Sequence, residues 1–255
     1  MRLQEHRFHL WGMVAWFVVL ELLLAAAILF WPSFEENIGP LRALAGPFEV
    51  GREIFDRLEQ GGVEAYVHGQ HFFKGCNAVG SLTAVVFAMG AVAGEAQRGT
   101  LELILARPLS RRRILLERWI AGAVAVALPV FATSLTIPWL LQFVDETMRL
   151  GPLMLASAQQ SALLLAIYSA TFLLSCVSSR PMVLGFGMML FVLFEFGIYI
   201  VKFVTHASIF RLADIGVFAR IGSTQSLDWR LTGPLLAWIA SMLWLSLAAF
   251  ARRVP

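Results

Sequence analysis

The chain has 255 residues, of which 58% are hydrophobic and only 15% are charged. A soluble domain of this length carries roughly 25% charged residues to cover its core, so a soluble globular protein is nearly excluded. The 20 Phe and 8 Trp residues exclude a disordered chain. The formal net charge is +3. The composition predicts a polytopic membrane protein, which we expect to be all-α. No low-complexity linker divides the chain, so we expect one domain over residues 1–255.

Six segments are long and apolar enough to span a membrane, which takes about 20 residues. The third is long enough to be tilted or kinked, because it contains Pro129 and Pro138. The first resembles a secretory signal, but its length and the later spans favour a retained anchor. In chain order, the predicted spans are Leu10–Phe30, Gly75–Gly94, Ile114–Phe143, Pro152–Val177, Met182–Val201 and Gly233–Phe250.

Three segments outside these spans are expected to lie at a membrane surface. Residues 1–10 predict a short amphipathic helix along the inner surface. Residues 32–74 form an outer segment, with a polar surface helix over Glu49–Gln60. Residues 202–232 are too apolar for a free loop, and they predict a re-entrant or interfacial helix pair packed against the spans.

Six spans place both termini on the same side of the membrane. Basic residues are nearly evenly divided between the two sides, but the short loop between spans two and three concentrates arginines. Because short cytoplasmic loops carry an excess of Lys and Arg, we expect this loop and both termini inside. The arginines concerned are Arg98, Arg107, Arg111, Arg112, Arg113 and Arg118.

The same loop, residues 95–110, carries an amphipathic pattern. Leu101, Leu105 and Leu109 repeat every four residues, and Gly99 and Pro108 punctuate the ends. The pattern predicts a short, stiff helix at the inner membrane surface, with Ser110 capping the next helix. A basic loop that only sets the topology would be the alternative.

This loop resembles the signature of the ABC-2 type permease family, the membrane subunits of ATP-driven exporters. The family pattern is an acidic residue, then R-G-T-L-E-x-L-L-x-x-P, then a serine and basic residues. The six spans and the apolar outer insertion after span five also fit, whereas the long outer segment after span one departs from the family and puts the substrate class in doubt. The matching residues are Glu95, Arg98, Gly99, Thr100, Leu101, Glu102, Leu103, Leu105, Pro108, Ser110 and Arg111.

The resemblance implies a permease fold like that of type V exporters, in a bacterial cytoplasmic (inner) membrane. The chain would dimerise with a second copy or a related permease, within membrane lipids. Residues 95–110 would be a coupling helix seated on one of two separate ATPase subunits, with polar contacts from Glu95, Arg98, Glu102 and Arg107. The chain itself would be non-catalytic and hold no cofactor, because ATP and Mg would bind the partner; no Walker A motif is present.

Two acidic residues, Glu21 and Glu195, lie within predicted spans. Ionisable groups in hydrocarbon are costly and often functional, so both are candidates to line a translocation path. A hydrogen-bonded structural carboxyl is the alternative for each. The other polar residues within spans, among them Asn77, Gln159 and Gln160, are expected to form interhelical hydrogen bonds.

Other kinds of site are weakly supported. His68 and His71 offer only two ligands, so no metal site is predicted. An intramembrane serine protease built on Ser81 or Ser223 would need a histidine at membrane depth, and no predicted span contains one. No basic face with interleaved aromatic residues indicates nucleic-acid binding.

Two alternative functions remain open. The chain could be a mechanical or regulatory membrane subunit that acts on a periplasmic protein through residues 32–74, without moving a substrate. It could instead be an ion-coupled secondary transporter that uses Glu21 and Glu195 and needs no ATPase. The sequence does not indicate the substrate.

Overall fold

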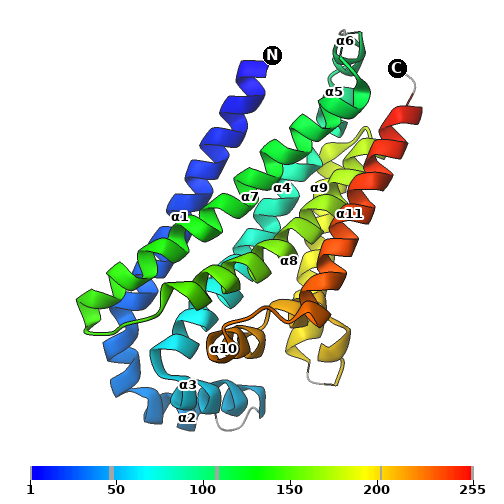
Figure 1. Cartoon of the computed structure of the whole chain (residues 1–255). Coiled ribbons are helices and arrows are strands. Elements are labelled where there is room, and N and C mark those ends of the chain that lie inside the picture. Colours follow the sequence, from blue (N-terminus) through cyan, green and yellow to red (C-terminus); the bar gives the residue numbers. More distant parts are fainter. Residues whose placement is uncertain (1, 46–48, 107–108, 202, 254–255) are drawn as a thin grey trace.

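The computed structural model describes residues 2–45, 49–106, 109–201 and 203–253. These residues are nearly all helical and include no strand. Six continuous helical stretches are long and apolar enough to cross a membrane, and they stand side by side in one bundle (Figure 1). The predicted all-α fold with six membrane-spanning helices is therefore confirmed.

The spanning stretches follow the predicted order. Pro129 and Pro138 both lie inside the third stretch, which remains helical through them. The six stretches are His9–Glu36 within α1 (Arg2–Glu36), Leu58–Met89 across α3 (Glu49–Val67), η1 (His68–Gly80) and α4 (Ser81–Met89), Arg111–Val144 across α7 (Arg111–Leu141) and η2 (Gln142–Val144), α8 (Leu150–Val177), α9 (Pro181–Ile200) and α11 (Trp229–Arg252).

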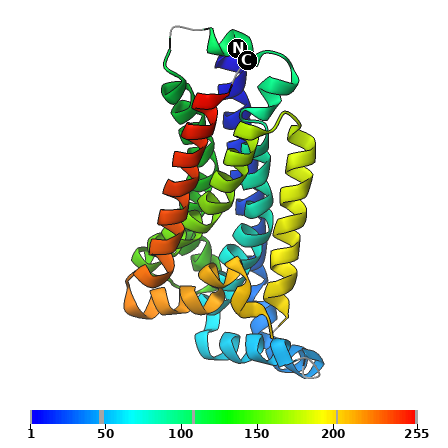
Figure 2. The ribbon, with the colours of Figure 1, turned by 90° about the vertical axis from the view of Figure 1, so that its right-hand side faces the viewer.

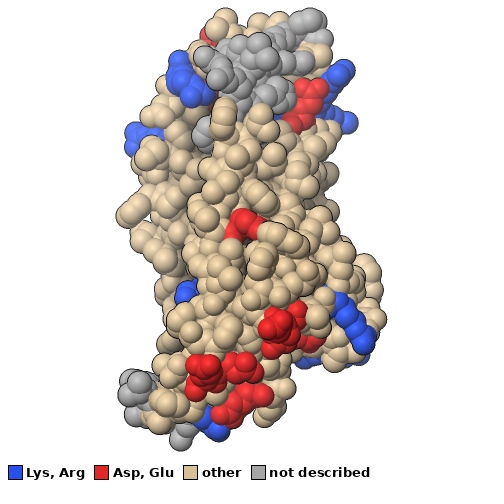
Figure 3. Space-filling model, turned by 90° about the vertical axis from the view of Figure 1, so that its left-hand side faces the viewer, with Lys and Arg blue, Asp and Glu red and all other residues tan. Residues whose placement is uncertain are grey.

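Helix α8 lies at the centre of the bundle. It contacts α4, α7, α9 and α11, and 72% of its most apolar stretch is buried, against 17% for α9. The peripheral helices α1, α9 and α11 expose large apolar side chains such as Trp11, Phe186 and Trp244. Figure 3 shows the charged residues gathered towards the two ends, with a broad band of mostly uncharged surface between them. This distribution is the one that a surrounding lipid bilayer requires.

Residues 2–10 do not form a separate element. Helix α1 runs without interruption from Arg2 to Glu36, so the described part of segment 1–10 continues the axis of the first span. A long helix is the simpler outcome because no Gly–Pro or turn sequence separates the two parts. The expected break before Leu10 is absent from the described residues.

The helical stretch that carries the second span extends back well before Gly75. It continues through η1, a 13-residue π-helix that contains His68 and His71, into α3. Polar residues interrupt the apolar pattern here, but both histidines are buried. On the outer side of this stretch lie α2 (Ile38–Ala45) and the first part of α3, which ends in a kink at Gly62.

The segment after α9 folds back onto the bundle. It forms two short 3₁₀ helices, η3 (Thr205–Ala207) and η4 (Ile209–Ala213), followed by α10 (Ile215–Thr224). The side chains of Phe210 and Phe218 are fully buried, which explains why so few charges occur here. Helices α2, α3 and α10 lie at one end of the bundle, while both termini lie at the other end (Figures 1 and 2).

Candidate functional site

Two short helices lie at the end that holds both termini: α5 (Ala93–Gln97) and α6 (Leu101–Leu105). We call residues 93–105 the α5–α6 segment. The single helix expected over 95–110 is wrong, because Gly99 adopts a left-handed conformation (φ 69°) between the two helices. Glycine alone adopts this conformation without a Cβ penalty, so it ends α5 and turns the chain into α6.

Ser175 of α8 fixes the start of this segment. Its buried hydroxyl accepts hydrogen bonds from the backbone N–H groups of Val92 and Ala93, both at 3.0 Å. The same hydroxyl donates to the carbonyl oxygen of Met89, also at 3.0 Å. One side chain therefore joins the end of α4, the start of α5 and the central helix α8.

Glu95 lies inside the segment and organises it. Only 2% of its surface is exposed, and one carboxylate oxygen lies 2.8 Å from Arg98 Nη2. The other carboxylate oxygen accepts from the hydroxyl of Thr100, and its backbone carbonyl accepts from the Thr100 N–H at 3.0 Å. Arg118 of α7 adds a longer ion pair at 3.9 Å and also donates to the Ala91 carbonyl oxygen. These contacts give a buried carboxylate the partners that it needs.

The predicted contact residues therefore separate into two groups. Glu95 and Leu101 are buried, and Thr100 is half-buried. Glu102 and Gly99 are exposed, as are the Arg98 side chain (63%) and Leu103 (66%). Arg107, Pro108 and the side chain of Leu105 lie outside the described residues. The exposed group forms the surface of the segment and the buried group holds its shape.

Arg253, the last residue that the structure describes, is bonded to the same end of the bundle. Ser110 caps α7 by accepting from Arg113 N, and Arg111 donates to the carbonyl oxygen of Arg253 at 2.7 Å. The Arg253 guanidinium in turn donates to the carbonyl oxygens of Cys176 (2.6 Å) and Ser178 (2.9 Å), at the end of α8. Charged donors at unpaired helix-end carbonyls are stabilising.

The sequence signature thus lies in and around the hydrogen-bonded α5–α6 segment, at one end of a six-helix membrane bundle. The family model for the ABC-2 family transporter protein matches residues 9–253, nearly the whole chain. The chain belongs to the ABC-2 transporter family. No curated protein matches it. As a member of this family, it is a multi-pass membrane protein of an ABC transporter.

Sequence reasoning about this permease missed Ser175, Arg118 and Arg253. Each lies far along the chain from the residues that it bonds, and none stands in a recognisable pattern. In the sequence, Arg118 is only one of several positive charges near the loop. A serine near the end of an apolar helix is common, and only the arrangement of α8 against α4 and α5 shows its role.

The two intramembrane acids of the permease have different surroundings. Glu195 is buried (8% exposed), and its carboxylate accepts from Ile209 N at 3.0 Å, at the start of η4. This contact supports the structural interpretation of Glu195. Glu21 is half-buried and accepts a hydrogen bond from Thr136 of α7 at 3.0 Å. Neither acid forms an ion pair among the described residues, so the two are not brought together as a site.

The other polar residues within the spans bond between helices. Gln160 donates to Asn77 at 2.7 Å, and Asn77 donates to the Ala213 carbonyl oxygen at 2.8 Å. Gln159 donates to the Leu212 carbonyl oxygen at 2.7 Å. These bonds join spans two and four to the segment after α9, as expected for polar groups in a membrane protein.

His71 lies within the second of the six candidate spanning stretches, whereas no predicted span contains a histidine. His71 Nε2 lies 3.3 Å from the Thr133 hydroxyl and 3.5 Å from the Ser134 hydroxyl. It does not contact Ser81 or Ser223, and Ser223 bonds to the Arg220 carbonyl oxygen instead. The described residues contain no group of three or more His, Cys, Asp or Glu side chains that could hold a metal ion.

Proposed function

We propose that the chain is the permease subunit of an ATP-driven exporter in a bacterial inner membrane. Two copies, or one copy and a related permease, would form the pathway. Two separate ATPase subunits would bind ATP and Mg and drive the change of state. The observation that carries this proposal is the α5–α6 segment, which presents exposed polar and apolar side chains on a buried, multiply bonded base.

In this proposal the end with both termini faces the cytoplasm. Arg98, Glu102 and Leu103 contact the ATPase, while Glu95 keeps Arg98 and Thr100 in place from inside. Switching between inward- and outward-facing states needs a rigid element whose position both subunits bias. A segment held by buried hydrogen bonds meets this requirement better than a free loop.

The pathway is proposed to form between permeases. Helices α1, α9 and α11 turn most of their surface outward, and lipid or a second copy can cover them. Glu21 on α1 remains the candidate for this surface, because its carboxylate is half-buried and has one neutral partner, Thr136, among the described contacts. Glu195 is left out because its carboxylate caps η4.

The test is co-purification of the permease with its ATPase, followed by measurement of ATP turnover. Arg98→Ala and Glu102→Ala are expected to weaken the complex and to lower turnover, because both side chains lie on the exposed surface. Arg180→Ala is the matched control, since Arg180 is also exposed, in the turn between α8 and α9. Unchanged assembly and turnover in both variants would show that the α5–α6 segment is not the coupling site.

A second function is favoured by the opposite end. Helix α2 and the first part of α3 are joined by ion pairs from Arg42 to Glu59 (2.7 Å) and to Asp56. Such a platform suits a mechanical subunit that acts on a periplasmic protein. Replacing residues 38–57 by a flexible linker would then remove partner binding and leave ATP turnover intact. Loss of export in the same variant would instead favour the exporter. Transport by the purified chain without any ATPase would favour an ion-coupled secondary transporter.

A further inference from the structure

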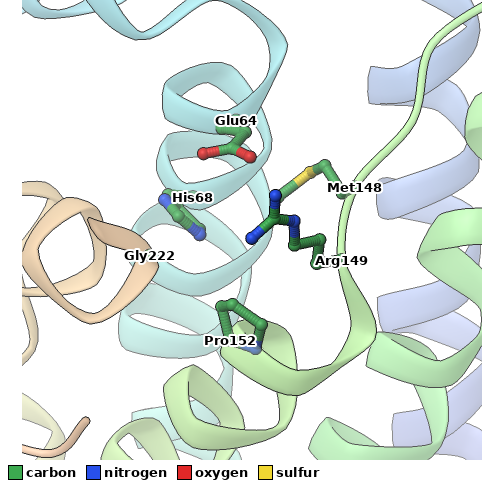
Figure 4. A pocket seen from close by; sticks show the side chains of 6 residues that line it. All are labelled: Glu64, His68, Met148, Arg149, Pro152 and Gly222. Carbon is green, nitrogen blue, oxygen red and sulfur yellow. The ribbon is translucent and has the colours of Figure 1, made fainter. Parts of the chain in front are cut away.

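A cavity of about 230 Å³ lies at the end of the bundle away from the α5–α6 segment. It opens between the last turns of α3, the start of η1, the start of α8 and α10. Figure 4 shows the side chains of Glu64, His68 and Arg149 directed towards one another across it. A water molecule takes up about 30 Å³, so the cavity has room for a small organic group.

The ring of His68 forms one wall of the cavity and is only 3% exposed. Its Nδ1 has no hydrogen-bond partner among the described residues and is closed off from solvent, so this atom does not face the cavity. A ligand in the cavity would therefore meet the rest of the ring.

The two charged groups are also free. Glu64 and Arg149 are both exposed towards the opening, and neither forms an ion pair or hydrogen bond within the part of the chain that the structure describes. Helix α8 begins at Leu150, so the positive end of its dipole lies beside Arg149. The cavity thus has a positive side at Arg149 and a negative side at Glu64.

We propose that this cavity binds a small zwitterion. Its phosphate or carboxylate would pair with the Arg149 guanidinium, and its ammonium group with the Glu64 carboxylate. The His68 ring would pack against the ligand from the wall of the cavity. A guanidinium binds planar anions through two parallel hydrogen bonds, which fits the first half of such a ligand.

Simpler ligands fit less well. A metal ion would have only two ligands, Glu64 and His68, and the cation of Arg149 beside them would repel it. An anion alone would leave the Glu64 carboxylate facing it across the cavity. The proposal does not rest on the coupling to an ATPase, because the cavity lies at the opposite end of the bundle.

The ligand could come from the bilayer or from solution. Glu64 lies near the end of α3 and Arg149 directly precedes α8, at the end of the bundle that carries α2 and α10 (Figure 1). That level is accessible to an ethanolamine phospholipid headgroup and to a soluble zwitterion. Both present the same pair of charges.

The experiment is direct binding to the purified full chain in detergent, by calorimetry. The soluble probes are O-phosphoethanolamine and β-alanine, with inorganic phosphate and ethanolamine as single-charge controls. The lipid probes are dihexanoyl phosphatidylethanolamine and dihexanoyl phosphatidylglycerol. We expect at least one of the three zwitterions to bind about tenfold more tightly than the single-charge probes. Whether the lipid or the soluble zwitterion binds more tightly then identifies the source.

Three variants localise the binding. Arg149→Gln and Glu64→Gln are each expected to weaken it by about tenfold. Gly222→Val should also block it while leaving every polar group in place. A Cβ at Gly222 would lie 3.8 Å from Glu64 Oε2 and 3.9 Å from His68 Cε1, so a larger side chain enters the cavity without a backbone clash. Arg211→Gln and Glu36→Gln are matched exposed controls and should bind as wild type.

Two results would overturn the proposal. The first is no binding of any zwitterion to the wild-type chain. The second is equal binding of phosphatidylglycerol and phosphatidylethanolamine, with neither affinity changed by Glu64→Gln. That result would show that the cavity binds only the anionic group. Neither result depends on ATPase assembly, so failure here is distinguishable from failure of the proposed function.

Discussion

At the residue scale, a few buried side chains determine the conformation of the α5–α6 segment. Ser175 bonds to three backbone groups that lie more than 80 positions away in the chain. Glu95 bonds to Arg98 and Thr100 within its own turn. Gly99 supplies the left-handed residue between them. The exposed residues of the signature depend on these buried ones for their positions.

Replacing Ser175 with Ala should lower the thermal stability of the purified chain. The buried N–H groups of Val92 and Ala93 would lose their acceptor, at a cost of about 1–3 kcal/mol. Thr171→Val is the control in the same helix, because the Thr171 hydroxyl bonds only to the Ile167 carbonyl oxygen one turn earlier. Equal melting temperatures for the two variants would contradict the role given to Ser175.

Replacing Gly99 with Ala should destabilise the segment by about 1–2 kcal/mol, the cost of a Cβ in the left-handed region. Gly99→Asn should cost less, because Asn tolerates this conformation. Gly90→Ala is the control on the same connection, since its φ is −92° and its Cβ would meet nothing within 4 Å. The readouts are limited proteolysis of the segment and co-purification with the ATPase. A Gly99→Ala chain that resists protease as well as Gly90→Ala would refute the argument.

At the element scale, small residues set how closely the helices approach. Gly122 of α7 lies directly against the ring of Tyr168 in α8, and a Cβ there would collide with the phenol. The Tyr168 hydroxyl donates to the Trp119 carbonyl oxygen at 3.1 Å, which fixes the ring in place. Small residues at such contacts are typical of helices that pack within membranes.

Gly122→Ala is therefore expected to destabilise the bundle by about 1–3 kcal/mol, because Tyr168 must move. Adding Tyr168→Phe should recover part of the loss, since it removes the hydroxyl at the point of collision. Gly187→Ala, on α9, is the control with open space around its Cβ. Thermal melting in detergent measures Gly122→Ala, Tyr168→Phe, the double variant and Gly187→Ala. A loss in the double variant equal to the sum of the losses in Gly122→Ala and Tyr168→Phe would indicate that the two positions are not coupled.

Hydropathy was sufficient to predict the six spans, because each needs only a long apolar stretch. It did not reveal that the helical stretch of the second span extends back past Gly75, because Glu64, His68 and His71 interrupt the apolar pattern although both histidines are buried. The signature residues could be listed from the sequence, but their burial could not. Glu95 and Arg98 look alike as charged residues, and only Thr100 and Arg118 show that Glu95 points inward.

At the scale of the whole molecule, the two ends differ in what they present. One end carries both termini and the α5–α6 segment, and the other carries α2, the start of α3 and α10 (Figure 1). Between them the surface is mostly uncharged (Figure 3). The proposed orientation puts the first end in the cytoplasm.

Cysteine labelling tests this orientation. Glu102→Cys and Ser226→Cys place one exposed thiol at each end, and the native Cys76 and Cys176 are both buried and should react slowly. An impermeant maleimide should modify Ser226→Cys in intact cells and Glu102→Cys only in inverted vesicles. The reverse pattern would place the termini outside and would rule out the proposed contact with a cytoplasmic ATPase.

The contacts of Ser175 and Arg253 also have a mechanical consequence. In the chain the α5–α6 segment joins α4 to α7, and the hydrogen bonds of Val92 and Ala93 to Ser175 also tie its start to α8. Arg253 ties the end of α11 to the end of the same helix. In the proposed function, a displacement of the segment by the ATPase would therefore act directly on α8. Because α8 packs against four other spanning helices, that displacement would reach all of them through one central helix.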